Sequence, residues 1–183
     1  MCCVPGPPRL SLAKGAGMQS NLKYAIVDTP FGHVLIIRSE KGLRSVSLPQ
    51  LPGTLRTGQT LYSPHDAEED LAAFSDLPLR LQRYYGGEAV GFPDEIDYED
   101  ATAFERVVWG ATRTITYGSA RSYGWVAAQI GMPRAWRAVG RALGRNPLAI
   151  VVPCHRVVST GGLGGFGGGL ALKKRLLALE AGA

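Results

Sequence analysis

The spacing of apolar residues changes along this chain, and that change most limits what the chain can fold into. Up to about residue 50, apolar and polar side chains alternate in short runs at 24–28, 32–38 and 43–48, as in half-buried strands. After about residue 100 the apolar residues recur every three to four positions, as in amphipathic helices. We therefore predict an α+β chain, in which a small N-terminal α/β domain precedes a mostly helical C-terminal domain.

Two helices with a short break between them are predicted in the second half. Apolar residues at 123, 126, 127 and 130 mark the first helix, and Ser122 suits its N-cap. Gly131-Met132-Pro133 ends that helix, and a second one runs from about residue 134 to about residue 143. This order is the pattern of a helix-turn-helix. An earlier helix is indicated by Phe104, Val107, Val108 and Ala111, which share one face.

The remaining segments complete the expected layout. Residues 67–85 suit a helix, although Pro78 leaves two shorter helices as an alternative. The apolar run at 148–152 predicts a short buried strand, and a last helix is expected at about 170–180. We divide the chain into a disordered leader at 1–20, an N-terminal α/β domain at 21–95 and a C-terminal domain at 96–183.

Charge is distributed unevenly between the two halves. Residues 1–100 contain 9 Lys and Arg against 13 Asp and Glu, whereas residues 101–183 contain 11 against 2. The second half, with a net charge of +9, predicts a polyanionic partner, most simply nucleic acid. The alternative is a basic surface that only contacts solvent.

The cysteine positions and the hydropathy of the chain indicate in which cellular compartment the protein lies. No apolar run approaches the ~18 residues of a membrane span, and the N-terminus has no apolar signal segment. Cys2 and Cys3 are adjacent and Cys154 is distant, so a disulfide framework is not expected. We predict a cytoplasmic protein without membrane contact, in a reducing setting.

The second helix of the predicted pair has a basic face. Arg134, Arg137, Arg141 and Arg145 fall within an arc of about 80° on a helical wheel if the helix extends to residue 145. Val139 and Leu143 lie on the opposite side, and Trp136 lies nearer to the core side. A helix with one basic and one apolar face is suited to lie along a nucleic-acid duplex.

One cysteine lies inside the body of the fold. Cys154 is followed by His155, directly after the predicted strand at 148–152. A thiol becomes a nucleophile when a neighbour takes its proton, although a buried structural cysteine is the alternative. Glu180 lies within an apolar stripe of the last helix, and a carboxylate in such a place is usually paired. These three residues suggest a Cys/His/Glu group in which the carboxylate orients the imidazole.

These motifs together resemble the methylated-DNA–protein-cysteine alkyltransferases, also called O6-alkylguanine-DNA alkyltransferases. The resemblance runs from about Phe104 to Glu180. It rests on Arg121-Ser-Tyr-Gly, Arg137-Ala-Val-Gly, Asn146-Pro, Ile150-Val-Val-Pro-Cys-His-Arg-Val, Gly167-Gly-Gly-Leu and Leu176-Leu-Ala-Leu-Glu. It implies a ribonuclease-H-like N-terminal domain and a helix-turn-helix, winged-helix-like C-terminal domain.

The resemblance implies a role for each of several residues. Cys154 would attack the alkyl carbon on guanine O6, and His155, held by Glu180, would take the thiol proton through a water. Tyr123 would donate a proton to guanine N3. Asn146 would link the second helix of the pair, the recognition helix, to the active-site strand. The backbone amides of Cys154 and of the Gly167 loop would stabilise O6. Arg137 would fill the space of a base flipped out through the minor groove. The other residues expected to contact DNA are Arg134, Arg141, Ala138, Trp136 and Ser122, and those expected to line the substrate pocket are Pro153, Phe166, Gly167, Gly168 and Val157.

The implied reaction is a single, irreversible transfer to Cys154 from O6-alkylguanine, with O4-alkylthymine as a second candidate substrate. A monomer would perform it on double-stranded DNA, with no cofactor. Two residues depart from the family's pattern, because Phe166 replaces a frequent Tyr and Trp136 replaces a small residue. Metal binding is not expected, since adjacent Cys2 and Cys3 with His33 and His65 make a poor ligand set.

Three other functions are open from the sequence. A damage-sensing DNA-binding protein would use the same helices without chemistry, but in such relatives the acceptor cysteine is replaced. A cysteine hydrolase would use Cys154 and His155 with turnover and without a basic helix. A dimeric helix-turn-helix repressor would leave the Cys-His pair without a role.

Overall fold

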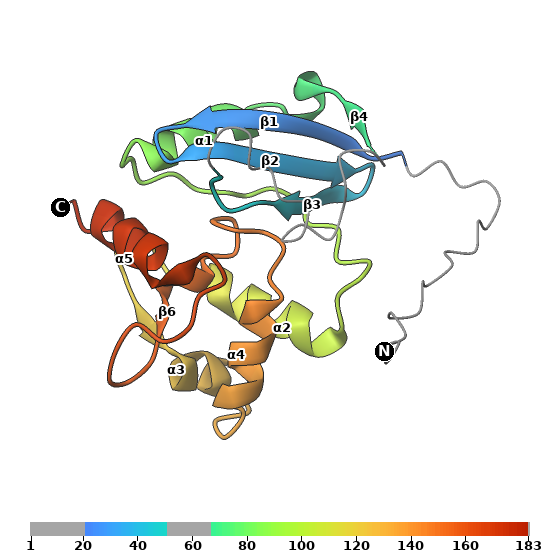
Figure 1. Ribbon diagram of the computed structural model, residues 1–183. Coiled ribbons are helices and arrows are strands. Elements are labelled where there is room, and N and C mark those ends of the chain that lie inside the picture. Colours follow the sequence, from blue (N-terminus) through green and yellow to red (C-terminus); the bar gives the residue numbers. More distant parts are fainter. Residues whose placement is uncertain (1–20, 51–66, 183) are drawn as a thin grey trace, which may run out of the picture.

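The computed structural model describes residues 21–50 and 67–182 of the chain. The expected leader at 1–20 and three of the considered metal ligands, Cys2, Cys3 and His65, lie outside the described residues. Figure 1 shows the sheet of the N-terminal half lying over the helices of the C-terminal half.

The N-terminal half contains a four-stranded sheet in the order β3-β2-β1-β4. The three predicted strands are confirmed as β1 (Lys23–Thr29), β2 (Gly32–Ser39) and β3 (Gly42–Val46), which pair antiparallel. The turn between β1 and β2 is closed by Thr29, whose hydroxyl donates to the carbonyl of Gly32 at 2.7 Å. β4 (Glu68–Glu69) pairs parallel with β1.

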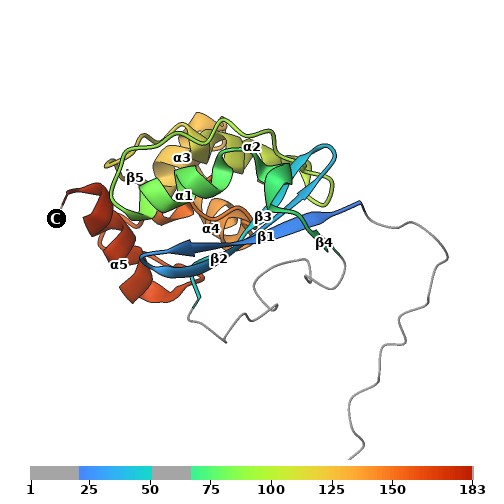
Figure 2. The ribbon, with the colours of Figure 1, turned by 90° about the horizontal axis from the view of Figure 1, so that it is seen from above.

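The segment at 67–85 forms two short helical elements, the alternative that Pro78 left open. The 3₁₀ helix η3 (Leu71–Phe74) precedes α1 (Leu77–Tyr85), in which Pro78 occupies the first turn, where its missing N–H is tolerated. α1 packs beside the strands, as the view from above in Figure 2 shows. Leu77, Leu81 and Tyr84 face the core.

The C-terminal half is built from α2 (Ala103–Arg113), α3 (Tyr123–Gln129), α4 (Trp136–Gly144) and α5 (Gly169–Glu180). The short strands β5 (Arg121–Ser122) and β6 (Val157–Val158) pair parallel between them. Ser122 caps α3 as predicted, because its hydroxyl accepts from the amide of Trp125 at 3.0 Å.

Two local predictions in this half are wrong. The core face of α2 contains Val108 and Trp109, whereas Val107 is exposed, because the indole of Trp109 reaches α4 and donates to the carbonyl of Ala142 at 3.0 Å. The run at 148–152 forms turns, not a strand. Within this run only Leu148 forms a bridge, to Val46 on the edge of β3 that does not pair with β2, and the chain then turns through Ile150 with a φ of 70°.

One hydrophobic core extends through both halves. Its buried side chains come from the sheet, α1, the helices α2 to α5 and the turns at 148–152. A backbone hydrogen bond connects the two halves at β3, where the amide of Val46 donates to the carbonyl of Pro147 at 2.9 Å. The loop that leads from α4 to Cys154 is therefore fixed against the edge of the sheet.

Candidate active site

Cys154 begins a short 3₁₀ helix, η4 (Cys154–Arg156), directly after the turns that follow α4. Asn146 lies just past the C-cap of α4 and shapes those turns: its side-chain nitrogen donates to the carbonyl of Val152 at 2.9 Å, and its oxygen accepts from the amide of Leu148 at 3.0 Å. The same nitrogen lies 3.3 Å from the sulfur of Cys154. Asn146 thus connects α4, the turns and the thiol through one side chain.

A cavity of about 210 Å³ opens in front of the thiol of Cys154. It lies between α4 with the turns that follow it, the N-terminus of α3, and the glycine-rich loop at residues 161–168 before α5, and Leu48 after β3 also reaches it. Segments distant in sequence thus form its walls. Of the predicted pocket residues, Phe166 and Gly167 line it. The others around it are Leu48, Tyr123, Gly140, Leu143, Gly144, Asn146, Ala149 and Gly165.

Three predicted pocket residues do not line this cavity. Val157 is fully buried in the core, and Gly168 packs against Leu48 and Leu172. Pro153 lines a different cavity, of about 260 Å³, together with Tyr117 and Arg156. The amide of Cys154 donates to the carbonyl of Val152 at 2.8 Å, so the predicted use of this amide to stabilise O6 would require that bond to break.

His155 and Glu180 form a buried pair behind the cysteine. The imidazole Nε2 lies 2.7 Å from Oε1 of Glu180, and both side chains are about 1 % exposed. Because a carboxylate only accepts, Nε2 carries the hydrogen and Nδ1 is left to accept a proton. Within the described residues, no direct hydrogen bond joins the imidazole of His155 to the thiol of Cys154.

Glu180 is the centre of a larger group of donors. Nε of Arg156 donates to Oε2 at 2.8 Å and Nη2 donates to Oε1 at 2.9 Å, while the amide of Gly118 donates to Oε2 at 3.1 Å. Burial alone would raise the pKa of Glu180, but the hydrogen bonds from His155 and Arg156 outweigh it and hold the pKa at about 2. Glu180 is therefore ionised at neutral pH.

The pKa values of the thiol and the imidazole move in opposite directions. Burial raises the pKa of the Cys154 thiol, against the hydrogen bond from Asn146 and the positive charge of Lys173. Burial lowers the pKa of His155, against the hydrogen bond and charge of Glu180. The resting site thus holds a protonated thiol and a neutral imidazole, which is the state a general base requires before it accepts a proton.

Tyr123 and the glycine-rich loop are packed closely against each other. The hydroxyl of Tyr123 donates to the carbonyl of Gly165 at 3.3 Å. Gly164 has a φ of +68°, and a Cβ there would lie 2.8 Å from the ring of Tyr123. Only glycine satisfies both conditions at this position.

Sequence reasoning gave no role to Arg156, and it also missed Lys173 and Tyr84. Lys173 of α5 is fully buried, and its ammonium donates to the carbonyls of Val157 at 2.6 Å and Gly165 at 3.2 Å, which ties β6 to the loop. Tyr84 of α1 places its hydroxyl 2.6 Å from Oε1 of Glu180 and 3.1 Å from Nε2 of His155. The position of Lys173 on the same face of the last helix as Leu176 and Glu180 was a detectable signal, whereas nothing in the sequence joined Tyr84 to the site.

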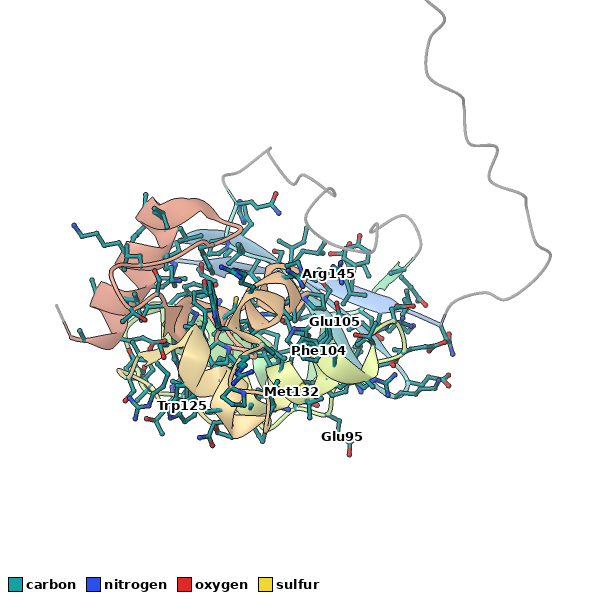
Figure 3. The ribbon with its side chains drawn as sticks, turned by 90° about the horizontal axis from the view of Figure 1, so that it is seen from below. Glu95, Phe104, Glu105, Trp125, Met132 and Arg145 are labelled. Atoms are coloured by element: carbon teal, nitrogen blue, oxygen red, sulfur yellow. The ribbon has the colours of Figure 1, made fainter. Side chains whose placement is uncertain are left out.

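The basic face of α4 is smaller than the wheel predicted. Arg137 and Arg141 lie on the helix and are exposed, but Arg134 precedes it and Arg145 is its C-cap. Arg145 forms an ion pair with Glu105 of α2 at 3.1 Å, and the two lie close together in Figure 3. Ala138 is half-buried between the exposed arginines and the core.

Trp136 does not pack toward the core as the wheel suggested. Its side chain is 46 % exposed, and the guanidinium of Arg137 stacks over its ring at 4.4 Å. The tryptophan begins α4, so its side chain precedes the turns of the helix that contact α2 and α3.

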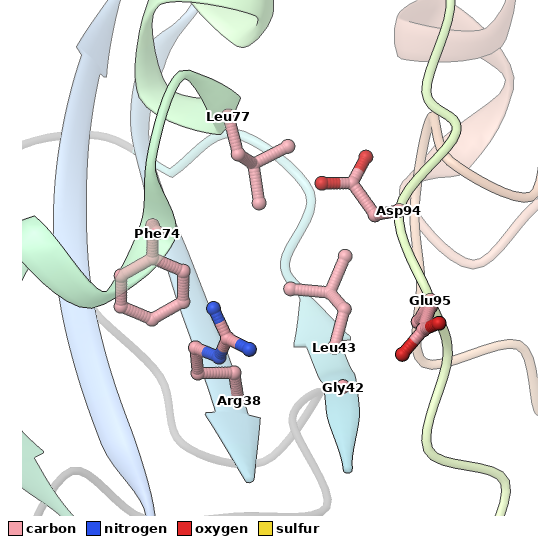
Figure 4. Close-up of a pocket in the computed structure, with 7 residues that line it drawn as sticks. All are labelled: Arg38, Gly42, Leu43, Phe74, Leu77, Asp94 and Glu95. Atoms are coloured by element: carbon pink, nitrogen blue, oxygen red, sulfur yellow. The ribbon is translucent and has the colours of Figure 1, made fainter. Parts of the chain in front are cut away.

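A separate cavity of about 190 Å³ lies in the N-terminal half, between β2, β3, η3 and the segment at 94–95 (Figure 4). No predicted site residue lines it. Its arginine, Arg38, donates to the carbonyl of Ala73, and its Asp94 pairs with Arg80 at 2.7 Å. Within residues 21–50 and 67–182, no cluster of side chains suited to a metal ion is found and no helix is long and apolar enough to cross a bilayer.

The exposed arginines on the helix pair are typical of a DNA-binding protein. The cavity beside them contains a cysteine with a histidine and a glutamate behind it, as in proteins that use a thiol nucleophile. Comparison with known proteins agrees with this class. Residues 103–182 match the family described as 6-O-methylguanine DNA methyltransferase, DNA binding domain.

Relatives match over most of the chain. The methylated-DNA–protein-cysteine methyltransferase of Mycolicibacterium paratuberculosis is 44 % identical over 87 % of this chain and 92 % of its own length. That of Methanosarcina acetivorans is 39 % identical over 86 % and 97 %. The crystal structure of Mycobacterium tuberculosis OGT in complex with DNA has a TM-score of 0.74 and 39 % identity, covering 87 % of this chain and 93 % of that one. The chain belongs to the methylated-DNA–protein-cysteine methyltransferases, a family of DNA-repair alkyltransferases.

Proposed function

We propose that the chain repairs O6-alkylguanine in double-stranded DNA by transferring the alkyl group to Cys154. The observation that carries this proposal is the thiol of Cys154 at the end of a cavity formed by α4 and the glycine-rich loop, with the buried His155–Glu180 pair behind it. DNA is the partner that the family and the basic C-terminal half support.

In the proposed transfer, every proton and electron pair has a donor and an acceptor. His155 takes the thiol proton on Nδ1 through a water, and Glu180 stabilises the resulting imidazolium through Nε2–H. The Cys154 thiolate attacks the alkyl carbon, so a carbon–sulfur bond forms as the carbon–O6 bond breaks. The electrons of that bond remain on the guanine, and Tyr123 donates a proton to N3. The thioether is stable, so each molecule acts once and needs no cofactor.

Access to O6 requires the base to leave the duplex. We propose that α4 enters the minor groove and that Arg137 occupies the vacated space, with Arg134 and Arg141 contacting phosphates. Arg137 and Arg141 are exposed on one side of α4, while Val139 and Leu143 on the other side are buried. Asn146, just past the end of α4, contacts the thiol, so a shift of α4 on DNA would be transmitted directly to Cys154.

The finer organisation also belongs to this proposal. We infer a ribonuclease-H-like domain at 21–95 and a winged-helix-like domain at 96–183, acting as a monomer in the cytoplasm. The sheet at 21–50 and the helices after residue 102 support that division.

Intact mass tests the function after incubation with a duplex that carries one O6-methylguanine. We expect wild-type protein to gain the mass of one methylene and Cys154→Ala to gain nothing while still binding the duplex. Binding without a mass gain in the wild type would favour a damage-sensing protein. If the wild type neither gains mass nor binds the duplex, a cysteine hydrolase would be favoured.

A further inference from the structure

A tyrosine from the N-terminal half lies inside the buried pair of the active site. Tyr84 is the eighth residue of α1, and its side chain is fully buried. Its hydroxyl lies 2.6 Å from Oε1 of Glu180 and 3.1 Å from Nε2 of His155. Those two atoms are themselves 2.7 Å apart, so the three groups form a closed triangle.

The direction of each bond follows from the hydrogens available. A phenol has one hydrogen, and a carboxylate can only accept, so the short contact means that Tyr84 donates to Glu180. Toward His155 the phenol oxygen is then an acceptor. The Nε2–H of His155 is shared between Glu180 and Tyr84, and Oε1 of Glu180 is shared between His155, Arg156 and Tyr84.

Aromatic contacts prevent the Tyr84 hydroxyl from turning away. The ring packs edge-on against Tyr117 and Phe92, each at 6.0 Å between centroids, and against Tyr85 at 5.3 Å. It also packs against the imidazole of His155 at 6.4 Å. The hydroxyl is therefore held in place before any substrate binds.

We propose that Tyr84 is a positioning residue for the transfer reaction: by donating to Glu180 it weakens the pull of that carboxylate on His155, so that the imidazole stays neutral and its Nδ1 remains free to accept the thiol proton. This inference rests on the proposed function. It also gives the N-terminal half a part in the chemistry of the C-terminal half.

Other charged groups face the same pair and remain in place when Tyr84 is changed. Arg156 and Lys173 disfavour the imidazolium, and Glu180 favours it. Tyr117 faces Glu180 and Arg156, and Cys154 faces Lys173. Removing the Tyr84 hydroxyl also takes away one neutral acceptor of the Nε2–H, but the charged Oε1 is the stronger acceptor and, once freed, attracts the proton on His155 more strongly.

Tyr84→Phe removes the hydroxyl and keeps the ring. Tyr85→Phe is the matched control, because Tyr85 is adjacent and fully buried, and its hydroxyl has no hydrogen-bond partner within the described structure. Single-turnover transfer from an O6-methylguanine duplex is measured against pH for the wild type and both variants. Circular dichroism verifies that each variant is folded.

We expect the acid limb of the rate profile to move to higher pH by about one unit in Tyr84→Phe, the size of one redistributed charge-assisted hydrogen bond. Below that limb the rate falls about tenfold, while the affinity for DNA is unchanged. Tyr85→Phe follows the wild type. A rate profile of Tyr84→Phe that coincides with that of Tyr85→Phe would overturn the proposal.

A second measurement needs no transfer reaction. The chain has three histidines, so ¹⁵N-histidine spectra resolve the titration of His155. We expect a neutral imidazole with hydrogen on Nε2 in the wild type, and a higher pKa in Tyr84→Phe only. If the wild type transfers no alkyl group, the proposed function fails, whereas an unchanged His155 titration in Tyr84→Phe refutes the role of Tyr84 by itself.

Discussion

Glu180 shows how a single residue gains its role from its surroundings. Its carboxylate accepts from Tyr84, His155, Arg156 and the amide of Gly118, so none of its lone pairs depends on water. Such a group costs little to bury as long as all its partners remain. The same saturation keeps it ionised and fixes the tautomer of His155.

Glu180→Gln should lower stability by about 3–5 kcal/mol at neutral pH, because Arg156 would be left buried without its counter-charge. The folded-state pKa of Glu180, about 2, lies below its unfolded value. Its contribution to stability is therefore complete above the unfolded pKa of about 4.3 and is lost as the pH falls toward 2.

Urea unfolding of the wild type and Glu180→Gln at several pH values measures this difference. We expect the gap between the two proteins to narrow below about pH 4. Glu95→Gln, at an exposed carboxylate, serves as the control. A gap that is independent of pH would contradict the assignment of the stability to the ionised form.

Trp136 offers a second test at the residue scale. Its ring holds the guanidinium of Arg137 at 4.4 Å, an exposed cation–π contact worth about 0.5–1 kcal/mol. If Arg137 must leave this position to enter DNA, Trp136→Ala should bind duplex about two- to fivefold more tightly. Fluorescence anisotropy gives the affinity, and the gain should vanish in an Arg137→Ala background. Weaker binding would instead support the expectation from the sequence that Trp136 itself contacts DNA.

At the scale of elements, the glycine-rich loop and α3 must fit each other. Gly164 combines a positive φ with close contact to the ring of Tyr123. Lys173 holds the same loop from the side of α5. The loop thus positions Phe166 and Gly167 at the cavity through contacts that are distant in sequence.

Gly164→Ala should cost about 1–2 kcal/mol for the left-handed backbone, and the added methyl group should displace Tyr123 and slow transfer. Gly161→Ala is the matched control, because a Cβ there meets nothing within 4 Å and the backbone is not left-handed. Thermal melts and single-turnover rates compare the two variants. Equal rates would show that Tyr123 tolerates the displacement.

At the scale of the whole molecule, the shared core is the main feature. Buried residues of the sheet, α1 and the C-terminal helices form one cluster, and Val46 bonds to Pro147 across the two halves. A core shared in this way favours one cooperative transition over two.

We therefore expect the two halves to unfold together. All three tryptophans, Trp109, Trp125 and Trp136, lie in the C-terminal half, so their fluorescence reports on that half alone. Hydrogen exchange of β1 and β2 reports on the sheet. The free energy of unfolding from tryptophan fluorescence should equal the free energy of opening from hydrogen exchange of β1 and β2. A lower value for the sheet would indicate that the N-terminal half opens independently.

Much of the fold and of the site could be predicted from local patterns. The strands at 23–46 and the capped helix at Ser122 follow from periodicity and cap chemistry, which depend only on neighbouring residues. Cys154, His155 and Glu180 could be named because each is unusual in its own segment. The run at 148–152 could not be assigned correctly, since its apolar residues are buried through turns against β3.

The sequence by itself determined the class of protein, and it predicted the group of Cys154, His155 and Glu180 and a basic helix, because these depend on residue type and short spacing. Only the tertiary structure decided that Tyr84 reaches Glu180, that Lys173 secures the loop, and that Trp136 faces outward. The physical reason is that contacts between distant elements depend on packing, which the local pattern of residues does not record.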